Sequence, residues 1–338
     1  MALFKKDPLQ IITFSSYGTP THLYIRGRAL EDENIDLTKR GFFSLLRNTW
    51  KRFETDEIAH TKLKIKLPND TFLYVTTDKK GYFKLKAEVP NLNDLTNSEG
   101  WLQYEISYED PQPGRVINND NRFAGEMLIP SETSKFGVCS DIDDTILHTG
   151  VTSFLKLKLV FNTFFKNVMK RSPLEGAASF YQLLHLGKTG EDANPIFYVS
   201  HSPWNLYRYL ALFLKEQTFP KGPVLLRDFP KPFSKKDSSE KPQKQKEIID
   251  ILTTYPNMQF ILIGDSGEHD ADIYIEIAEA FPKRIKAIYL RSVKHKKKML
   301  RIQGIFDSYN KVPTLLVKSS EEAIEHATAQ EFIAAPKL

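Results

Sequence analysis

Three carboxylates lie within four residues of the chain, in the stretch Ser140-Asp141-Ile142-Asp143-Asp144-Thr145. Two like charges about 4 Å apart repel by roughly 4 kcal/mol at an effective dielectric constant near 20, so a fold that brings them together needs a counter-charge, a shared proton or a divalent cation. On an extended chain, Asp141 and Asp143 point to one face and Asp144 points to the other. We therefore expect Asp141 and Asp143 to act as a pair.

The position of this acidic cluster bears on two interpretations. A calcium-binding loop or a helix cap would need only an Asx-rich turn, which is common. Here the cluster follows the run Lys135-Phe136-Gly137-Val138-Cys139, which predicts a short buried strand, and it precedes Thr145 and two apolar residues. Ligands of open α/β sheets bind at the carboxyl ends of strands, so this position favours catalysis.

The Asp-x-Asp-x-Thr pattern of Asp141, Asp143 and Thr145 resembles the first motif of the haloacid dehalogenase superfamily of phosphatases. Three longer stretches resemble, more narrowly, the fungal actin-patch phosphatidate phosphatases and their bacterial relatives: FGVCSDIDDTI, YVSHSPWNLY and FILIGDSGEHDADIY. These are lipin-like, magnesium-dependent enzymes. The resemblance is strong over roughly residues 130–295 and weaker before them.

The resemblance implies a role for each residue of the first two motifs. Asp141 would be the nucleophile that forms an aspartyl-phosphate, and Asp143 would protonate the leaving alkoxide and then deprotonate the attacking water. Thr145 would hold the loop at the phosphate, and Ser200, which ends the apolar run Ile196–Val199, would hydrogen-bond the phosphoryl oxygens. Structural roles remain open for the first three, as a ligand, a cap or an ordinary turn.

The third motif is a lysine that offsets the charge on the phosphate and on Asp141. Lys244 and Lys246 are both available. Apolar residues follow Lys244 at helical spacing, so it shares the buried face of a predicted helix, whereas Lys246 falls about 160° away from Ile248 and should face water. The resemblance agrees with Lys244, because the family's lysine also precedes an apolar residue by four positions and a proline, here Pro256, by twelve.

The fourth motif is Gly264-Asp265-Ser266-Gly267-Glu268-His269-Asp270, which follows a very apolar predicted strand. Glycine lets the backbone approach a bound ion, and Asp265 could supply an oxygen ligand beside Asp141. Oxygen ligands with a phosphate nearby favour Mg²⁺ over zinc. Asp270 would act through water or through Lys244. We predict a Mg²⁺ site that includes Asp141, Asp143 with its backbone carbonyl, Asp265 and Asp270.

The composition favours a cytoplasmic protein. At 338 residues, with 41% apolar and 26% charged residues, the chain allows two domains and an ordinary core. Its one cysteine, Cys139, excludes an internal disulfide framework and suits a reducing compartment. No signal peptide or run of roughly 20 apolar residues is present, so the chain would reach a membrane only peripherally. The net charge of +5 is modest, so the distribution of charge matters more than its total, and we expect no nucleic-acid partner.

Residues 1–130 are predicted to form a small β-sandwich with a helical insert. The run Thr61–Leu67 alternates between apolar residues and lysines, as a half-buried antiparallel strand does. Phe72–Thr77 and Tyr82–Lys86 are predicted to pair as a hairpin across a turn that ends at Gly81. The spacing of Phe42, Leu46, Trp50 and Phe53 predicts the insert. We find no catalytic constellation here.

Residues 135–338 alternate between predicted strands and helices, so we expect an α/β fold with a Rossmann-like parallel sheet of the haloacid dehalogenase type. A helix is predicted from Pro203 with Ser202 as its cap, and another from Ala271 to Ala280. The last helix is predicted near Ser319. The predicted strands are Phe136–Ser140, Ile196–Ser200, Val224–Arg227, Phe260–Gly264, Ile285–Leu290 and Thr314–Val317.

Three basic segments leave the predicted sheet at strand carboxyl ends. They lie within 149–174, 231–246 and 291–301, and the first is also amphipathic. Such segments can be solvated, or packed on the protein, or can bind an anionic bilayer. We expect peripheral contact with anionic membrane and hydrolysis of phosphatidate to diacylglycerol, the lipid being implied by the resemblance alone. The alternatives are a phosphatase for a soluble phosphomonoester and a membrane- or protein-docking module.

Overall fold

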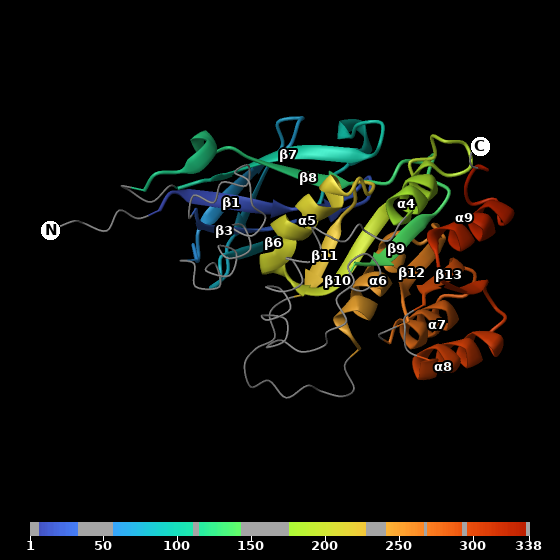
Figure 1. Ribbon diagram of the computed structural model, residues 1–338. Coiled ribbons are helices and arrows are strands. Elements are labelled where there is room, and N and C mark those ends of the chain that lie inside the picture. The colour runs from blue at the N-terminus through green and yellow to red at the C-terminus, as the bar shows by residue number, and fades with distance from the viewer. Residues whose placement is uncertain are drawn as a thin grey trace. The chain divides into compact units, whose positions relative to one another are not determined.

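A computed structural model of the chain describes residues 7–32, 57–110, 115–142, 176–227, 241–266, 269–292 and 296–335. The predicted helix at 42–53, the basic segment at 149–174 and the predicted site residues Asp143 and Thr145 lie outside the described residues. The chain divides into two compact units, Met1–Pro130 and Ser131–Leu338, and Figure 1 labels the elements of each.

The N-terminal unit is a sandwich of two sheets, as predicted. Its strands are β1 (Leu9–Phe14), β2 (Ser16–Tyr17), β3 (His22–Glu31), β4 (Lys62–Lys66), β5 (Phe72–Thr76), β6 (Tyr82–Glu88), β7 (Trp101–Tyr108) and β8 (Phe123–Leu128). One sheet has the order β1-β3-β6 and the other the order β2-β8-β7-β4-β5. Leu63 and Ile65 of β4 are fully buried in the core between the sheets, while Lys62 and Lys66 are exposed.

The predicted hairpin between β5 and β6 is wrong. β5 pairs with β4 in one sheet, and β6 pairs with β3 in the other. The turn between them therefore carries the chain from one sheet to the other. In this turn the Asp78 carboxylate accepts hydrogen bonds from the backbone amides of Lys80 and Tyr82. Alternation and turn residues locate strands, but long-range packing selects their partners.

The C-terminal unit has one six-stranded sheet in which every pair is parallel. Its strands are β9 (Gly137–Asp141), β10 (Ile196–Pro203), β11 (Val224–Arg227), β12 (Phe260–Asp265), β13 (Ile285–Arg291) and β14 (Thr314–Val317). Its helices include α4 (Ala177–Leu186), α5 (Tyr207–Glu216), α6 (Gln243–Thr254), α7 (Asp270–Ala280), α8 (Lys296–Asp307) and α9 (Ser320–Ala329). The α/β prediction is confirmed.

The strand order β11-β10-β9-β12-β13-β14 defines where a ligand can enter. Successive strands run outward from β9 on one side and from β12 on the other, so the order reverses between these two central strands. In doubly wound sheets this switch point, at the strands' carboxyl ends, is where ligands bind. α4 contacts α9 and α6 contacts α7, the two pairs covering opposite faces of the sheet (Figure 1).

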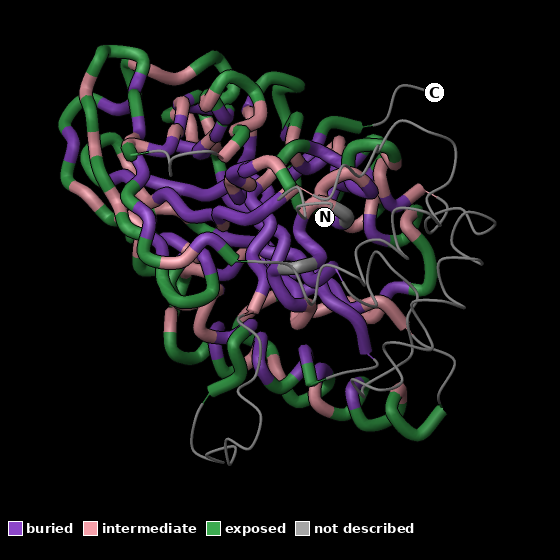
Figure 2. The backbone as a smooth tube through the Cα atoms, turned by 90° about the vertical axis from the view of Figure 1, so that its left-hand side faces the viewer, coloured by how far each residue is buried: buried purple, intermediate pink, exposed green. Residues whose placement is uncertain are grey.

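Burial follows from this arrangement. β9 and β12 are buried at every residue, as expected for strands covered by helices on both faces. In Figure 2 the central strands are purple, whereas the helices alternate between buried and exposed residues. Within the described part of the chain, the helices are too short or too polar to cross a bilayer.

The predicted cap at Ser202 is also wrong. β10 continues to Pro203, which pairs with Arg227 of β11, and α5 begins only at Tyr207 after a short 3₁₀ turn. The amide of Ser202 instead donates to Ser200 Oγ at 2.9 Å. Strand pairing at the sheet edge outweighs the local capping signal. The last helix begins where it was predicted, and the Ser319 side chain caps α9 by accepting from the Glu322 amide.

Replacing Gly81 by alanine should lower the free energy of unfolding of the N-terminal unit by about 2 kcal/mol or more. Gly81 has φ +73°, and a Cβ there would lie 2.3 Å from the carbonyl oxygen of Ala29. Lys80→Ala in the same turn removes only an exposed side chain and should change stability by less than about 0.5 kcal/mol. Urea denaturation measures the free energy of unfolding of both variants. Equal values would contradict the predicted strain of a side chain at position 81.

Candidate active site

Two of the predicted carboxylates end the two central strands. Asp141 is the last residue of β9 and Asp265 the last of β12, and both are fully buried. Ser140 is aligned with Ile263 in the pairing of these strands, so Asp265 lies one residue beyond the level of Asp141. Sheet pairing, which a rigid backbone enforces, therefore brings together groups 124 positions apart in sequence.

Lys244 brings a positive charge to this edge of the sheet from the first turn of α6. Its Nζ lies 3.1 Å from Asp141 Oδ2 and 2.7 Å from Asp270 Oδ1, and the residue is 1% exposed. Lys246 is half-buried and follows on a different side of the helix. The helical stripe that distinguished the two lysines corresponds to the buried face observed, where Ile248 and Ile251 accompany Lys244.

Asp270 begins α7 and accepts hydrogen bonds at both carboxylate oxygens. Oδ1 accepts from Lys244, and Oδ2 accepts from the backbone amide of Asp265 at 3.2 Å. A carboxylate in the first turn of a helix also interacts favourably with the helix dipole. Asp270 thus fixes the lysine and the end of β12 at once.

Gly264 permits this approach. A Cβ at Gly264 would lie 2.3 Å from Asp270 Oδ2 and 2.9 Å from the Tyr274 ring. The Tyr274 hydroxyl donates to the carbonyl of Ile263 at 3.0 Å, and burial, together with the nearby Asp270, raises the pKa of Tyr274, so the donor stays protonated. The absence of a side chain at Gly264 thus lets Asp270 and Tyr274 approach the backbone closely.

Three carboxylates share this site with one lysine. Asp141, Asp265 and Asp270 each offer an oxygen, and these atoms all lie within 4.8 Å of one another. All three carboxylates are buried, and Lys244 forms ion pairs with two of them. The donor set is oxygen only and is rich in negative charge, which fits a hard divalent cation such as Mg²⁺.

Ser200 reaches the same edge from β10. The residue before it, Val199, is aligned with Asp141 in the pairing of β10 with β9. Ser200 is 2% exposed, and its hydroxyl accepts from Ser202. The structure thus gathers Asp141, Ser200, Lys244, Asp265 and Asp270 at one edge of the sheet, and their individual roles remain predictions.

Tyr181 is a neighbour of the site that the sequence analysis did not single out. Its hydroxyl lies 2.6 Å from Ser140 Oγ, directly before Asp141. Burial raises the pKa of Tyr181, so the contact is between two neutral groups. The apolar spacing of Ala177, Phe180 and Leu184 with Tyr181 would have predicted α4, but no sequence signal indicates the serine as its partner.

Known proteins are similar to this chain over the region that contains the site. The family model of the phosphatidate phosphatase APP1 catalytic domain matches residues 136–292. Phosphatidate phosphatase APP1 of Saccharomyces cerevisiae is 34% identical over 232 residues, which is 68% of this chain and 36% of that protein. An uncharacterized protein of Schizosaccharomyces pombe is 27% identical over 263 residues, which is 71% of this chain and 40% of that protein.

The chain therefore spans well under half the length of these two relatives. Among solved structures, Bacteroides thetaiotamicron EndoBT-3987 aligns over 97% of this chain and 66% of its own, at 6% identity and a TM-score of 0.24. Similarity at that level carries no argument about this chain.

Lys244→Met should lower the free energy of unfolding of the C-terminal unit by about 3–5 kcal/mol, because it leaves the buried carboxylates of Asp141 and Asp270 without their cation. Lys246→Met changes the same residue type on the same helix and should cost less than about 1 kcal/mol. Chemical denaturation in the presence of EDTA measures both. Similar losses for the two variants would contradict the assignment.

Proposed function

We propose that this chain, which belongs to the family of the phosphatidate phosphatase APP1 catalytic domain, hydrolyses phosphatidate to diacylglycerol and inorganic phosphate. The observation that carries the proposal is the ion-paired group of Asp141, Lys244 and Asp270 beside Asp265, at the switch point of the sheet and inside the matched residues. Phosphoryl transfer asks a protein mainly for positioning and for neutralisation of charge, and this group can supply both.

In the proposed reaction, Asp141 attacks the phosphorus of the monoester. The bond between phosphorus and the glycerol oxygen breaks, and Asp143 gives its proton to the departing alkoxide, which leaves as diacylglycerol. Asp141 then carries an aspartyl-phosphate. Water attacks that phosphorus and loses a proton to Asp143, which releases phosphate and restores both carboxyl groups.

The remaining residues hold the phosphoryl group and its charge. The Lys244 ammonium, held by Asp141 and Asp270, is proposed to offset the negative charge that develops on the phosphoryl oxygens. Ser200 is proposed to donate a hydrogen bond to one of these oxygens, and Thr145 to hold the loop that follows β9.

A Mg²⁺ ion is part of this proposal. Asp141, Asp265 and the backbone carbonyl of Asp143 would hold it, and Asp270 would act on it through water or through Lys244. When bound, the ion would neutralise the phosphoryl charge and orient the ester. The support for this ion is the convergence of three buried carboxylates at the site.

Asp141→Asn should lower kcat/KM for phosphatidate by at least about a thousandfold, a loss of roughly 4 kcal/mol of transition-state stabilisation. Asparagine keeps the shape of the side chain but is a far poorer nucleophile. Asp250→Asn, on an exposed position of α6, is the matched control and should leave turnover unchanged. Phosphate release from mixed micelles of phosphatidate measures both variants. Full activity in the Asp141 variant would show that Asp141 is not the nucleophile.

Removal of divalent cations with EDTA should abolish turnover, and Mg²⁺ should restore it. The same assay separates the alternatives to a lipid phosphatase. Preference for sugar phosphates over phosphatidate would favour a phosphatase for soluble esters. A chain whose Asp141→Asn variant kept its full biological effect would be a docking module instead.

We also propose peripheral contact with anionic membrane at the carboxyl edge of the sheet. α8 begins shortly after β13 ends at this edge, and Lys296, Lys297 and Lys298 in its first turn are exposed. Leu300, which follows them, is 64% exposed. Lysines beside an exposed apolar side chain are suited to an interface of anionic headgroups and acyl chains.

Replacing Lys296 and Lys297 by glutamate should weaken binding to vesicles that contain phosphatidylserine by roughly 30-fold or more, at about 1 kcal/mol for each lysine removed. Lys135→Glu with Lys283→Glu makes the same change in net charge at exposed positions before β9 and β13, at the opposite edge of the sheet, and should have a smaller effect. Wild-type binding should weaken as salt rises. Equal effects of the two double variants, or binding independent of salt, would argue against this membrane face.

A further inference from the structure

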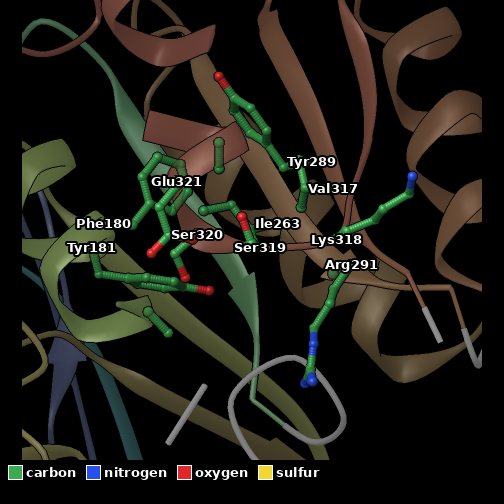
Figure 3. Close-up of a pocket in the computed structure, with 13 residues that line it drawn as sticks. Phe180, Tyr181, Ile263, Tyr289, Arg291, Val317, Lys318, Ser319, Ser320 and Glu321 are labelled. Carbon is green, nitrogen blue, oxygen red and sulfur yellow. The ribbon is translucent and has the colours of Figure 1, made fainter. Parts of the chain in front are cut away.

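A cavity of about 240 Å³ lies beside the candidate active site, where α4 and α9 cover the carboxyl-terminal parts of β12, β13 and β14 (Figure 3). It belongs wholly to the C-terminal unit. The reaction proposed above uses none of the side chains that line it. Its lining includes Gly264, the residue directly before Asp265, so the cavity reaches the edge of the sheet where the carboxylates lie.

One part of the cavity wall is apolar. Ile263 and Tyr289 are aligned partners on β12 and β13, and the ring of Phe180 from α4 packs edge-on against Tyr289 at 5.6 Å. Val317 of β14 and Ala323 of α9 complete the wall. Such a surface suits a hydrocarbon chain, because the transfer of apolar groups out of water is favourable.

The two tyrosines of the wall do not make it charged. The Tyr289 hydroxyl hydrogen-bonds with His326 Nδ1 at 2.8 Å, and the Tyr181 hydroxyl with Ser140. Burial raises the pKa of both tyrosines, so neither ionises near neutral pH. Each ring thus presents its apolar part to the cavity while its hydroxyl already has a partner.

The lining also has polar and charged side chains: Ser319, Ser320 and Glu321 from the start of α9, and two cations, Arg291 and Lys318. Arg291 ends β13 and is aligned with Asp265, so its side chain starts on the same side of the sheet as the last carboxylate of β12. In Figure 3 its guanidinium points away from the rings of Phe180 and Tyr289, and Lys318 also extends away from them. A ligand with an apolar tail and an anionic head would match both parts of this surface.

We propose that the cavity binds one acyl chain of the lipid substrate, while Arg291 contacts the polar part that joins this chain to the phosphate. The inference rests on the proposed function, because that function places a phosphomonoester at Asp141. An apolar wall, a cation and the carboxylate group follow one another within a few residues of β12 and β13, so one lipid molecule could contact all three.

The test uses monoalkyl phosphates from ethyl to decyl, all below their micelle concentration, so that chain length changes without an interface. For the wild-type chain, kcat/KM should rise about fourfold for each methylene that enters the cavity and then level off. Ala323→Phe fills the cavity from α9 and should flatten this rise. Ala329→Phe, exposed on the same helix, is the matched control and should keep the wild-type rise.

Ala177→Leu fills the cavity from α4 and decides the matter if Ala323→Phe does not fold. It should also reduce the dependence on chain length. A wild-type chain with no such dependence would overturn the proposal. So would dependence that stays the same in both filling variants, since the chain would then lie elsewhere.

Binding of decyl phosphate, measured by isothermal titration calorimetry, separates this inference from the proposed function. Binding that depends on chain length and is lost in the filling variants, without any turnover, would support the cavity and refute the phosphatase. Turnover of every ester at the same kcat/KM would support a phosphatase and refute the cavity. Occupation of the cavity by another segment of this chain would appear as a wild type that binds ethyl and decyl phosphate equally, which also overturns the proposal.

Discussion

Lys244 lies between the carboxylates of Asp141 and Asp270, and all three side chains are closed off from solvent. Taking such ions out of water costs several kcal/mol each, and their attraction compensates only when the geometry is good and hydrogen bonds satisfy the remaining atoms. Apolar residues of similar volume would stabilise a sheet edge at least as well. The fold thus buries this ion-paired group, at a cost in stability, where a ligand would enter. Such burial is typical of a site that binds a charged reactant.

The parallel sheet makes this arrangement possible. β9 and β12 are adjacent and aligned, so their ends present Asp141 and Asp265 at nearly the same level, while α6 and α7 bring Lys244 and Asp270 from one face. These four residues all belong to strands or helices, so their placement does not depend on a long loop. The separation of the charges is therefore set by strand pairing and helix packing, which are among the stiffest parts of a protein.

Successive side chains of β9 point to opposite faces of the sheet, so the two faces hold different groups. Asp141 points to the face of α6 and meets Lys244, whereas Ser140 before it points to the face of α4 and meets Tyr181. The ion pair of Asp141 with Lys244 thus lies on one side of β9, and the partly apolar cavity lined by Tyr181 lies on the other. A substrate with an anionic head and an apolar tail could contact both sides of the same strand ends.

The strands of the parallel sheet could be located almost residue by residue from the amino-acid order alone. Continuous apolar runs of four to six residues, bounded by polar clusters, are typical of strands that helices cover on both faces. The choice of the buried lysine was also local, since Lys244 lies on the stripe of Ile248 and Ile251 and the pitch of a helix places Lys246 on another side.

Which elements meet became clear only from the three-dimensional arrangement. The alternating runs at β5 and β6 identified two strands but not that each joins a different sheet, and the cap at Ser202 was overruled by the pairing of Pro203 with Arg227. The contact of Tyr181 with Ser140, and the cavity between α4 and α9, likewise depend on packing between distant segments. The secondary structure of a segment follows from its own backbone preferences and from which of its side chains must be buried. Which segments pack together depends instead on the free energy of the whole assembled core.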